Sequence, residues 1–290
     1  RLHLVGAGIL SAANPGASGQ VGKVTLRAAN VSLNQGAQIS IAANHGMPVA
    51  NTTSDQRIRV DAGRLLLDQS AITAASTGNV PASAIQIHAD DLRLANNSRI
   101  TTEASQANAG PIAIGGGRLW LTDSLITTSA NGTTGDGGDI TLTPEYLILD
   151  GGFIQANTAA QGARGGDILI ATRALIASQG LVEIGGATRQ DFVTDSGRNI
   201  IQAAAPGGEQ GAINVTAPDL DLTASLTPLA TPFNNPDDLF TDLCRAASGE
   251  RASSLVERGN GGLSPAPGTP GAVSFAGERL DRLRGPSRVH

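Results

Sequence analysis

The chain is poor in several residue types on which common protein classes depend. Aromatic residues make up 2% and charged residues 16% of its 290 residues, and Lys23 is the only lysine among 20 basic residues. With a net charge of −5, the chain offers neither the basic field nor the stacking platforms that bind nucleic acid. It contains no run of 18 apolar residues, so no membrane span is expected. Because 40% of the residues are hydrophobic and recur regularly, disorder is not expected either.

Cysteine and histidine give no sign of a metal site. A single cysteine, Cys244, excludes both an internal disulfide and a thiolate site. The four histidines show no metal-ligand spacing and no arrangement with serine and aspartate that would predict nucleophilic catalysis. We therefore expect no metal, no cofactor and no catalytic residue. The chain opens with Arg1 and has no signal peptide before it, which predicts a longer precursor.

Glycine, in contrast, is abundant, and the apolar residues repeat. Counted from Ile112, apolar residues fall at offsets 0, 2, 7, 9 and 14, and counted from Ile140 they fall at the same offsets. The repeat origins lie at residues 24, 58, 85, 112, 140 and 168, separated by 34, 27, 27, 28 and 28 residues. In the coils that start at 24 and 85 the last apolar position slips by one residue. In the coil that starts at 168 the series ends on Val182, with Ala177 as a weakened position.

The pairs at offsets 0/2 and 7/9 have the strand period of two rather than the helical period of 3.6. Each repeat therefore predicts three short strands separated by turns rich in Gly, Asn, Asp and Ser. In turns such as GDGGD (135–139) and GARGGD (162–167), Gly supplies positive φ and Asp caps its own backbone. Three short strands per repeat of about 28 residues describe one coil of a parallel β-helix, which we expect to be right-handed, within an all-β fold.

Departures from the repeat mark the ends and the loops. Leu2, Leu4 and Ile9 fit offsets 7, 9 and 14, so the chain begins in mid-coil, which predicts further coils before it. Insertions lie near 45–56 and near 184–210. Loops that project from one corner are where solenoids usually carry recognition, whereas tolerated loop variation is the simpler interpretation.

The pattern restarts at Ile213 and then stops, so we expect β-helix coils over 1–226 and a Pro/Gly-rich cap and tail over 227–290. Asn235 and Pro236 are suited to the start of a short amphipathic helix, and Gly249 is suited to its end. This helix would cover the last coil, whose apolar core and strand edges are otherwise open. The expected cap residues are Leu239, Phe240, Leu243 and Cys244.

The outward positions of the first two strands carry no carboxylate, which argues against the clustered acids of a polysaccharide-cleaving β-helix. The acids fall in turns instead, as at Asp68, Asp139, Asp150 and Asp167, where capping a turn is their expected role. In the last coils these outward positions become apolar. Trp120, Ile148 and Ile176 are predicted to stack at about 4.8 Å spacing, with Leu169 and Leu66 adding to this interaction stripe. Either the chain's own tail or a lateral partner would cover it.

Two segments, GGDITLTPEYLILDGGFIQANT (137–158) and GGDILIATRALIASQG (165–180), combine a Gly-Gly-Asp turn, an alternating strand pair and a Gly- or Ser-containing corner. With LCRAASGERASSLVERGNGGL (243–263), they resemble the filamentous-haemagglutinin-like exoproteins of two-partner secretion, over most of residues 20–265. The resemblance implies export through an outer-membrane partner barrel and a location at the bacterial cell surface, as adhesin, matrix or surface-layer material.

Three functions are therefore expected to compete. The first is a secreted, non-catalytic structural or adhesive surface protein that self-associates laterally or binds a surface polysaccharide. The second is a polysaccharide-binding or polysaccharide-cleaving β-helix, in which the two insertions converge with Asp55, Arg189 or Asp191. The third is a stalk that displays another domain upstream.

Overall fold

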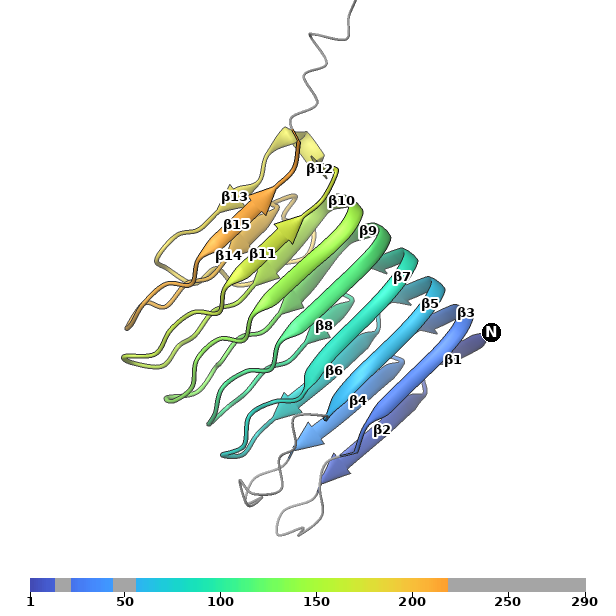
Figure 1. The fold of residues 1–290 in the computed structure, drawn as a ribbon, viewed down its shortest axis with the longest axis horizontal. Coiled ribbons are helices and arrows are strands. Elements are labelled where there is room, and N and C mark those ends of the chain that lie inside the picture. The colour runs from blue at the N-terminus through green and yellow to red at the C-terminus, as the bar shows by residue number, and fades with distance from the viewer. Residues whose placement is uncertain (14–21, 44–55, 219–290) are drawn as a thin grey trace, which may run out of the picture. The chain divides into compact units, whose positions relative to one another are not determined.

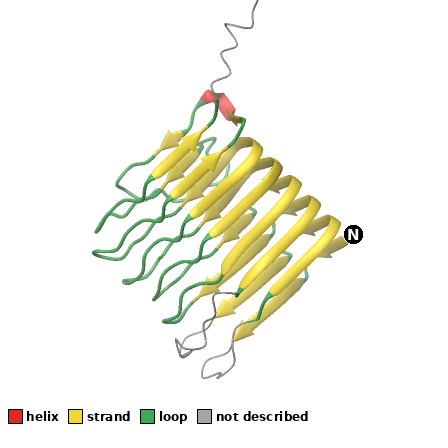
Figure 2. Cartoon of the chain, viewed as in Figure 1, coloured by secondary structure: helices red, strands yellow, loops and turns green. Residues whose placement is uncertain are grey.

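The computed structural model describes residues 1–13, 22–43 and 56–218. The chain divides into two units, Arg1–Asp221 and Leu222–His290, and all the described residues belong to the first. Within the described residues the fold is all-β, apart from the 3₁₀ turn η2 (Figures 1 and 2). The elements are β1 (Leu2–Val5), β2 (Gly8–Ala13), β3 (Val24–Asn34), β4 (Gln38–Ala43), β5 (Arg57–Asp68), β6 (Ala71–Ser76), β7 (Ala84–Ala95), β8 (Arg99–Thr101), β9 (Ile112–Thr127), β10 (Ile140–Gln155), β11 (Ile168–Ala171), β12 (Ala174–Ala177), η2 (Ser178–Gly180), β13 (Glu183–Ile184), β14 (Ile200–Gln202) and β15 (Ile213–Thr216).

All strand pairs are parallel, and the strands wind in a solenoid-like coil in which each repeat lies on the one before it (Figure 1). Equivalent apolar residues are direct partners: Ile112 pairs with Ile85 and Ile140, and Ile140 pairs with Ile168. The predicted repeat and its register are therefore confirmed. A shift of one residue would turn every inward side chain outward, so burial specifies this register strongly.

The inward residues form one continuous core. Its ladders follow the predicted offsets, and nearly every member in the middle coils is buried completely. Leu2, Leu4 and Ile9 pair with Val31, Leu33 and Ile39, so the expected mid-coil register of the first residues is also confirmed. The ladder at the last offset consists of Ile9, Ile39, Ile72, Ile100, Ile126, Ile154 and Ile201.

The one-residue slip is absorbed in a single turn. Where the spacing is longer, two consecutive residues adopt positive φ, namely Gln35 with Gly36 and Asn96 with Asn97. Where it is shorter, only one residue does so at the corresponding turn: Gln69, Asp123 or Gly151. The extra residue therefore adds one left-handed step and leaves the pairing of the flanking strands unchanged.

The coils differ from three separate short strands. The first two segments run as one bent strand in β3, β5 and β7, and all three run as one strand in β9 and β10. Backbone pairing continues through the bend, for example between Thr143 and Gly115, so the strand does not end there. Stacking on the next coil, rather than local turn sequence, decides where a strand ends.

In the coil that starts at Ile168, the position predicted for Val182 is wrong. Val182 does not occupy the final position of its coil, because Ile154 pairs with Ile201 of β14. The short strand β13 pairs with the far side of β14, with Ile184 opposite Ile201. The insertion therefore spans 178–199 rather than 184–210, and residues 203–210 belong to an ordinary turn between β14 and β15. Val182 still packs against the core as a partly buried residue.

Candidate interaction surface

The predicted outward column of the second segment exists. Ile148 of β10 pairs with Trp120 of β9 on one side and with Ile176 of β12 on the other. The remaining predicted stripe residues do not join them. Leu66 is separated from Trp120 by Arg93, and Leu169 lies in a different column, between Thr141 and Asn214.

Tyr146 extends this surface and was missed. It points outward two residues before Ile148 on β10, and its register partners are Arg118 and Ala174. The only tryptophan and the only tyrosine of the chain therefore lie on one face of adjacent strands. Tyr146 is 42% exposed and Ile176 is 52% exposed. We call Trp120, Tyr146, Ile148 and Ile176 the open ladder.

Arg93 and Arg118 lie on the same face, next to Trp120 and Tyr146. The Arg93 guanidinium lies 5.0 Å from the centroid of the Trp120 ring, within cation–π range. The indole Nε1 of Trp120 is buried and finds no hydrogen-bond acceptor in the part of the chain that the structure describes. Buried indole N–H groups usually have an acceptor, so within the described ranges the Trp120 N–H is left as an unused hydrogen-bond donor at this end of the open ladder.

Two aspartates on the outer surface gather arginines from neighbouring coils. Arg27 and Arg59 both donate to Asp61 Oδ2, at 3.2 and 3.0 Å. Hydrogen bonding from Arg59 holds the pKa of Asp61 below its ordinary value, with Arg27 adding to the effect. The prediction that the outward positions of the first two segments carry no carboxylate is therefore wrong at Asp61, which points outward beside the bend of β5.

Asp91 is the more buried of the two, and Arg118, Arg93 and Arg64 surround it, with Nε–carboxylate distances of 2.9, 3.3 and 3.4 Å. Burial acts to raise the pKa of Asp91, but the hydrogen bonds from Arg118 and Arg93 outweigh it, so the pKa is lowered. Both aspartates are thus paired with arginines, although the buried Oδ2 of Asp91 accepts no hydrogen bond within the described residues and meets Arg64 only as an ion pair.

At Asp139 and Asp167 the predicted capping of the residue's own turn is wrong, because these carboxylates link successive coils. Asp136 accepts from the Arg164 backbone N–H at 2.8 Å, and Asp139 accepts from the Asp167 N–H at 2.9 Å. Asp167 in turn accepts from the Ala212 N–H at 2.8 Å. Each carboxylate therefore satisfies a backbone donor of the next coil. Nowhere in the described ranges do three or more His, Cys, Asp or Glu side chains form a group able to hold a metal ion.

A second apolar column lies on the outward side of the third segment. Phe153 pairs with Leu125 on one side and with Ile200 on the other, and all three side chains are buried. The insertion 178–199 covers them: the Phe192 ring meets Phe153 edge-on at a centroid distance of 5.1 Å. Arg99 lies 5.9 Å from the other ring centroid, that of Phe192. We call Leu125, Phe153 and Ile200 the covered ladder.

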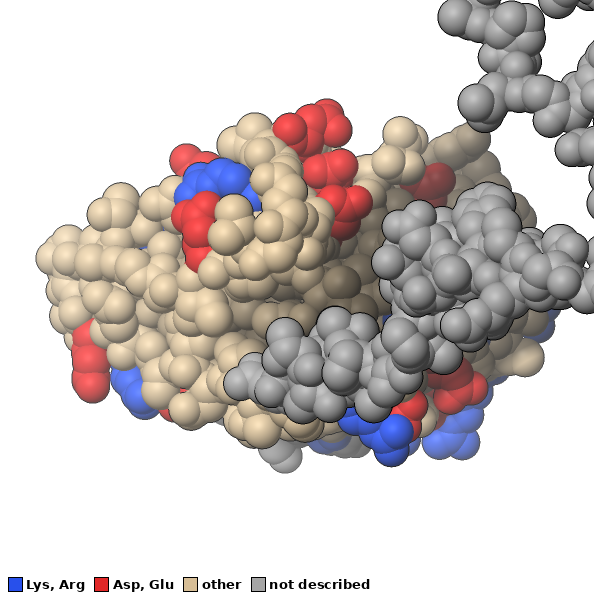
Figure 3. Space-filling model, turned by 90° about the horizontal axis from the view of Figure 1, so that it is seen from above, with Lys and Arg blue, Asp and Glu red and all other residues tan. Residues whose placement is uncertain are grey.

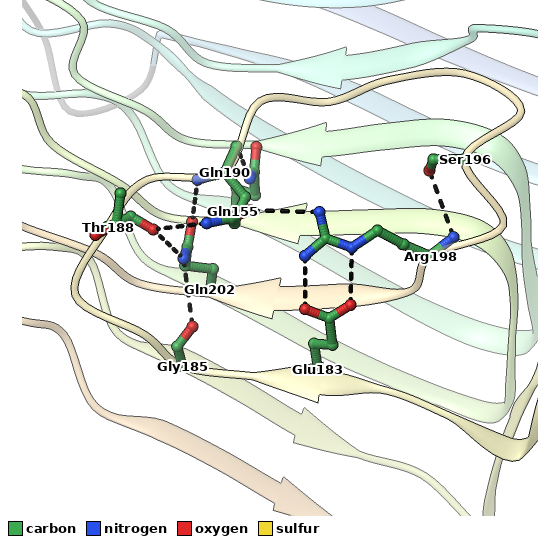
Figure 4. Close-up of polar contacts among 8 residues, drawn as sticks. All are labelled: Gln155, Glu183, Gly185, Thr188, Gln190, Ser196, Arg198 and Gln202. Atoms are coloured by element: carbon green, nitrogen blue, oxygen red, sulfur yellow. Dashed lines mark hydrogen bonds and ion pairs between the residues drawn. The ribbon is translucent and has the colours of Figure 1, made fainter.

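Polar contacts fasten the insertion, as Figure 4 shows. Gln202 Nε2 donates to the carbonyls of Thr188 and Gly185, at 2.9 and 3.3 Å, while its Oε1 accepts from the Gln190 N–H at 2.9 Å. Gln155 Nε2 donates to the Gln190 carbonyl at 2.6 Å. Gln155 and Gln202 point outward from adjacent strands, so two coils hold the same loop.

An ion pair closes the other end of the loop. Arg198 donates from Nε and Nη2 to the two carboxylate oxygens of Glu183, at 2.8 and 2.6 Å. Hydrogen bonding from Arg198 lowers the pKa of Glu183, and Glu183 raises the pKa of Arg198. The insertion is thus held on the coils by specific hydrogen bonds and one ion pair.

Arg189 reaches back from the insertion to earlier coils and donates to Asn131 Oδ1 at 2.7 Å. Glu103 lies in the same region; burial raises its pKa, while Arg99 and Arg189 act in the opposite direction. Asp191 is exposed. Of the predicted polysaccharide residues, Arg189 therefore serves to hold the cover in place.

The remaining sequence predictions for the C-terminal part and the first insertion lie outside the described residues. They concern Asp55, the segment 45–55 and the cap residues Leu239, Phe240, Leu243 and Cys244. The described residues contain no helix with the length and apolarity of a membrane crossing.

The fold and its outward columns define an all-β, solenoid-like repeat protein of parallel strands. Comparison with known proteins adds no closer assignment. The chain matches no protein-family model, no curated protein and no solved structure.

Proposed function

We propose that the chain is a non-catalytic, right-handed parallel β-helix that serves as a structural or adhesive protein at a bacterial cell surface. Ladders of identical or similar residues support the β-helix assignment, and the Gly-Gly-Asp turns that link its coils resemble those of filamentous-haemagglutinin-like exoproteins. By that resemblance, an outer-membrane partner barrel exports the protein.

The observation that carries a structural role is the open ladder. An exposed apolar column rimmed by charged residues is a feature of interaction sites, because water-exposed apolar surface of this kind is costly unless covered. The partner we propose is a second copy of the chain. A two-fold axis near Ile148 would place each open ladder against its equivalent and would bury Ile176 and Tyr146 together.

Sedimentation velocity of the full chain tests this proposal. We expect concentration-dependent association of the unaltered protein and none for the triple variant Trp120→Ser, Ile148→Ser, Ile176→Ser, with little change in the melting temperature. Leu169→Ser is the matched control, since Leu169 is also exposed but lies in another column. A monomeric unaltered protein, or a triple variant that melts much earlier, would show that the open ladder is covered within the chain, against the proposal.

Location is tested separately. Intact cells of the source bacterium should be labelled by an antibody against the coil region, and the label should disappear when the partner barrel gene is deleted. Labelling only after the cells are permeabilised would refute a surface role.

A further inference from the structure

One coil carries only small residues at the outward positions of its first segment. Ala113 and Gly115 of β9 lie between Gln86 and His88 of β7 on one side and Thr141 and Thr143 of β10 on the other. Adjacent strands are about 4.8 Å apart, so the side chains of β7 and β10 stand about 10 Å apart across a floor one strand wide. The floor continues along β9 over Gly116 and Gly117.

Gly116 and Gly117 are required by the backbone. Gly116 has φ of 133°, and a Cβ at either residue would approach the carbonyl oxygen of Ala89 or Asp90 to 1.9 or 2.4 Å. Gly115 has no such constraint. Its φ is not positive, and the nearest atom to a Cβ there would be the Thr143 side-chain oxygen, at 2.9 Å.

Every other described coil carries a side chain at this position, namely Arg27, Asp61, His88, Thr143, Ala171 or Thr216. Glycine within a strand weakens the strand by roughly 0.5–1 kcal/mol relative to alanine. Backbone geometry therefore does not explain Gly115, whereas an open floor does.

The result is a trough formed by two adjoining hollows. One has a volume of about 230 Å³ and extends toward Arg59 and Asp61, and the other has a volume of about 640 Å³ and extends toward Asp90 and Glu145. Both are lined by His88, Gly115 and Thr143, so the two hollows adjoin at these residues. Their volumes fall near the range of about 300–1,000 Å³ that small-molecule sites occupy.

The lining disfavours anions and suits a ligand rich in hydroxyl groups. Arg59 is paired with Asp61 and Glu145 with Arg173, and the carboxylate of Asp90 adds a negative charge, so no excess of positive charge remains to attract a phosphate, sulfate or carboxylate. Thr141 and Thr143 offer hydroxyls on one wall, and Gln86 and His88 offer amide and imidazole groups on the other. Sugar hydroxyls, like these groups, both donate and accept hydrogen bonds.

The floor of the trough is apolar and flat enough to pack against a sugar ring. Ala113 and the three glycines present a methyl group and flat backbone, against which the C–H face of a sugar ring can pack. Figure 3 shows one face of the molecule, on which charged side chains lie in small groups between wider areas of other residues. We propose that this trough, defined by Ala113, Gly115, His88 and Thr143, is a binding site for a neutral saccharide chain. It is independent of the open ladder.

Affinity electrophoresis of the full chain tests this site. The gels contain one neutral polysaccharide each (mannan, dextran, galactan or xyloglucan), with polygalacturonate as the acidic comparison. We expect at least one neutral polysaccharide to retard the unaltered protein. The double variant Ala113→Gln, Gly115→Thr fills the floor with residue types found in this column and its neighbour on adjacent coils, and it should lose at least tenfold in affinity.

Thr25→Gln is the matched control, because Thr25 is exposed in the same outward column, three coils away from Ala113. Its retardation should equal that of the unaltered protein. The double variant should melt no earlier than the unaltered protein, since Thr favours a strand and Gly does not. If melting is lowered, the milder Gly115→Ala variant should still weaken binding.

Three results would overturn the proposal: no retardation by any neutral polysaccharide, retardation by polygalacturonate alone, or retardation that the double variant retains. None of them bears on lateral association, which sedimentation measures without saccharide.

Discussion

The covered ladder and the open ladder are built in the same way, yet they meet different surroundings. Each is a column of large apolar residues that points outward from adjacent parallel strands. Phe153 is completely buried in the first, whereas Ile176 is 52% exposed in the second. The difference is the insertion 178–199, which folds over the first ladder, whereas among the described residues Tyr146 and Ile176 of the second stay exposed. An outward apolar column is thus stabilised when another segment packs against it, and that segment can belong to the same chain.

The largest expected effect comes from emptying the covered ladder. Phe153→Ala should lower the free energy of unfolding by about 3–5 kcal/mol, because a buried aromatic ring is replaced by a cavity beneath Phe192. Urea denaturation of this variant and of Trp120→Ala measures the contrast. If the half-buried Trp120 cost as much as Phe153, the two ladders would not differ in the way described.

A smaller effect is expected from releasing the cover. Gln202→Ala removes the amide that holds three backbone groups of the insertion, at Gly185, Thr188 and Gln190. Leaving such partly buried groups without partners costs about 1–3 kcal/mol.

Limited proteolysis gives the second readout for this variant. Cleavage within 185–198 should become faster, while the coils stay intact. Gln38→Ala is the control, because Gln38 is an exposed residue at the start of β4. Unchanged cleavage in Gln202→Ala would mean that the insertion is fastened elsewhere.

The smallest effect is a pH dependence at Glu103, beneath Arg189 of the insertion. Burial raises the pKa of Glu103 above the ordinary 4.5, so the folded protein binds this proton more tightly than the unfolded chain does. The corresponding stability is therefore present at low pH and is lost as the pH rises through the folded pKa.

Glu103→Gln should accordingly melt at a slightly higher temperature than the unaltered protein at pH 7, and the two should converge below pH 4.5. Comparing the two proteins at each pH cancels the acid destabilisation expected from Asp61, Asp91 and Glu183, whose pKa values are lowered. A lower melting temperature of Glu103→Gln at pH 7 would show that attraction to Arg99 and Arg189 outweighs burial.

The interior was predictable residue by residue, as Ile112 and Ile140 show, because the strand period of two assigns each side chain to a face. Trp120, Ile148 and Ile176 were predictable as a stack for the same reason. Tyr146 was not predicted, although the same alternation places it outward, two residues before Ile148 on the same strand.

The trough and the arginine–aspartate clusters could not be predicted from the sequence. Gly115 looks like any turn glycine in the string GGG, and only the backbone separates it from Gly116, whose φ is positive. Asp91 also meets Arg64 and Arg118, which each lie 27 residues away from it along the chain. They meet because the corner residues of three coils lie on one another.

The parallel repeat, its register and its continuous core can be read from the residues alone, because each of these follows from alternation within short segments and from equal spacing between them. That Ile201 rather than Val182 completes the coil that starts at Ile168, and that Phe192 lies on Phe153, depends on tertiary contacts. Contacts of that kind join residues that no period relates, so they are set by which exposed apolar surface the folded coil leaves for the insertion to cover.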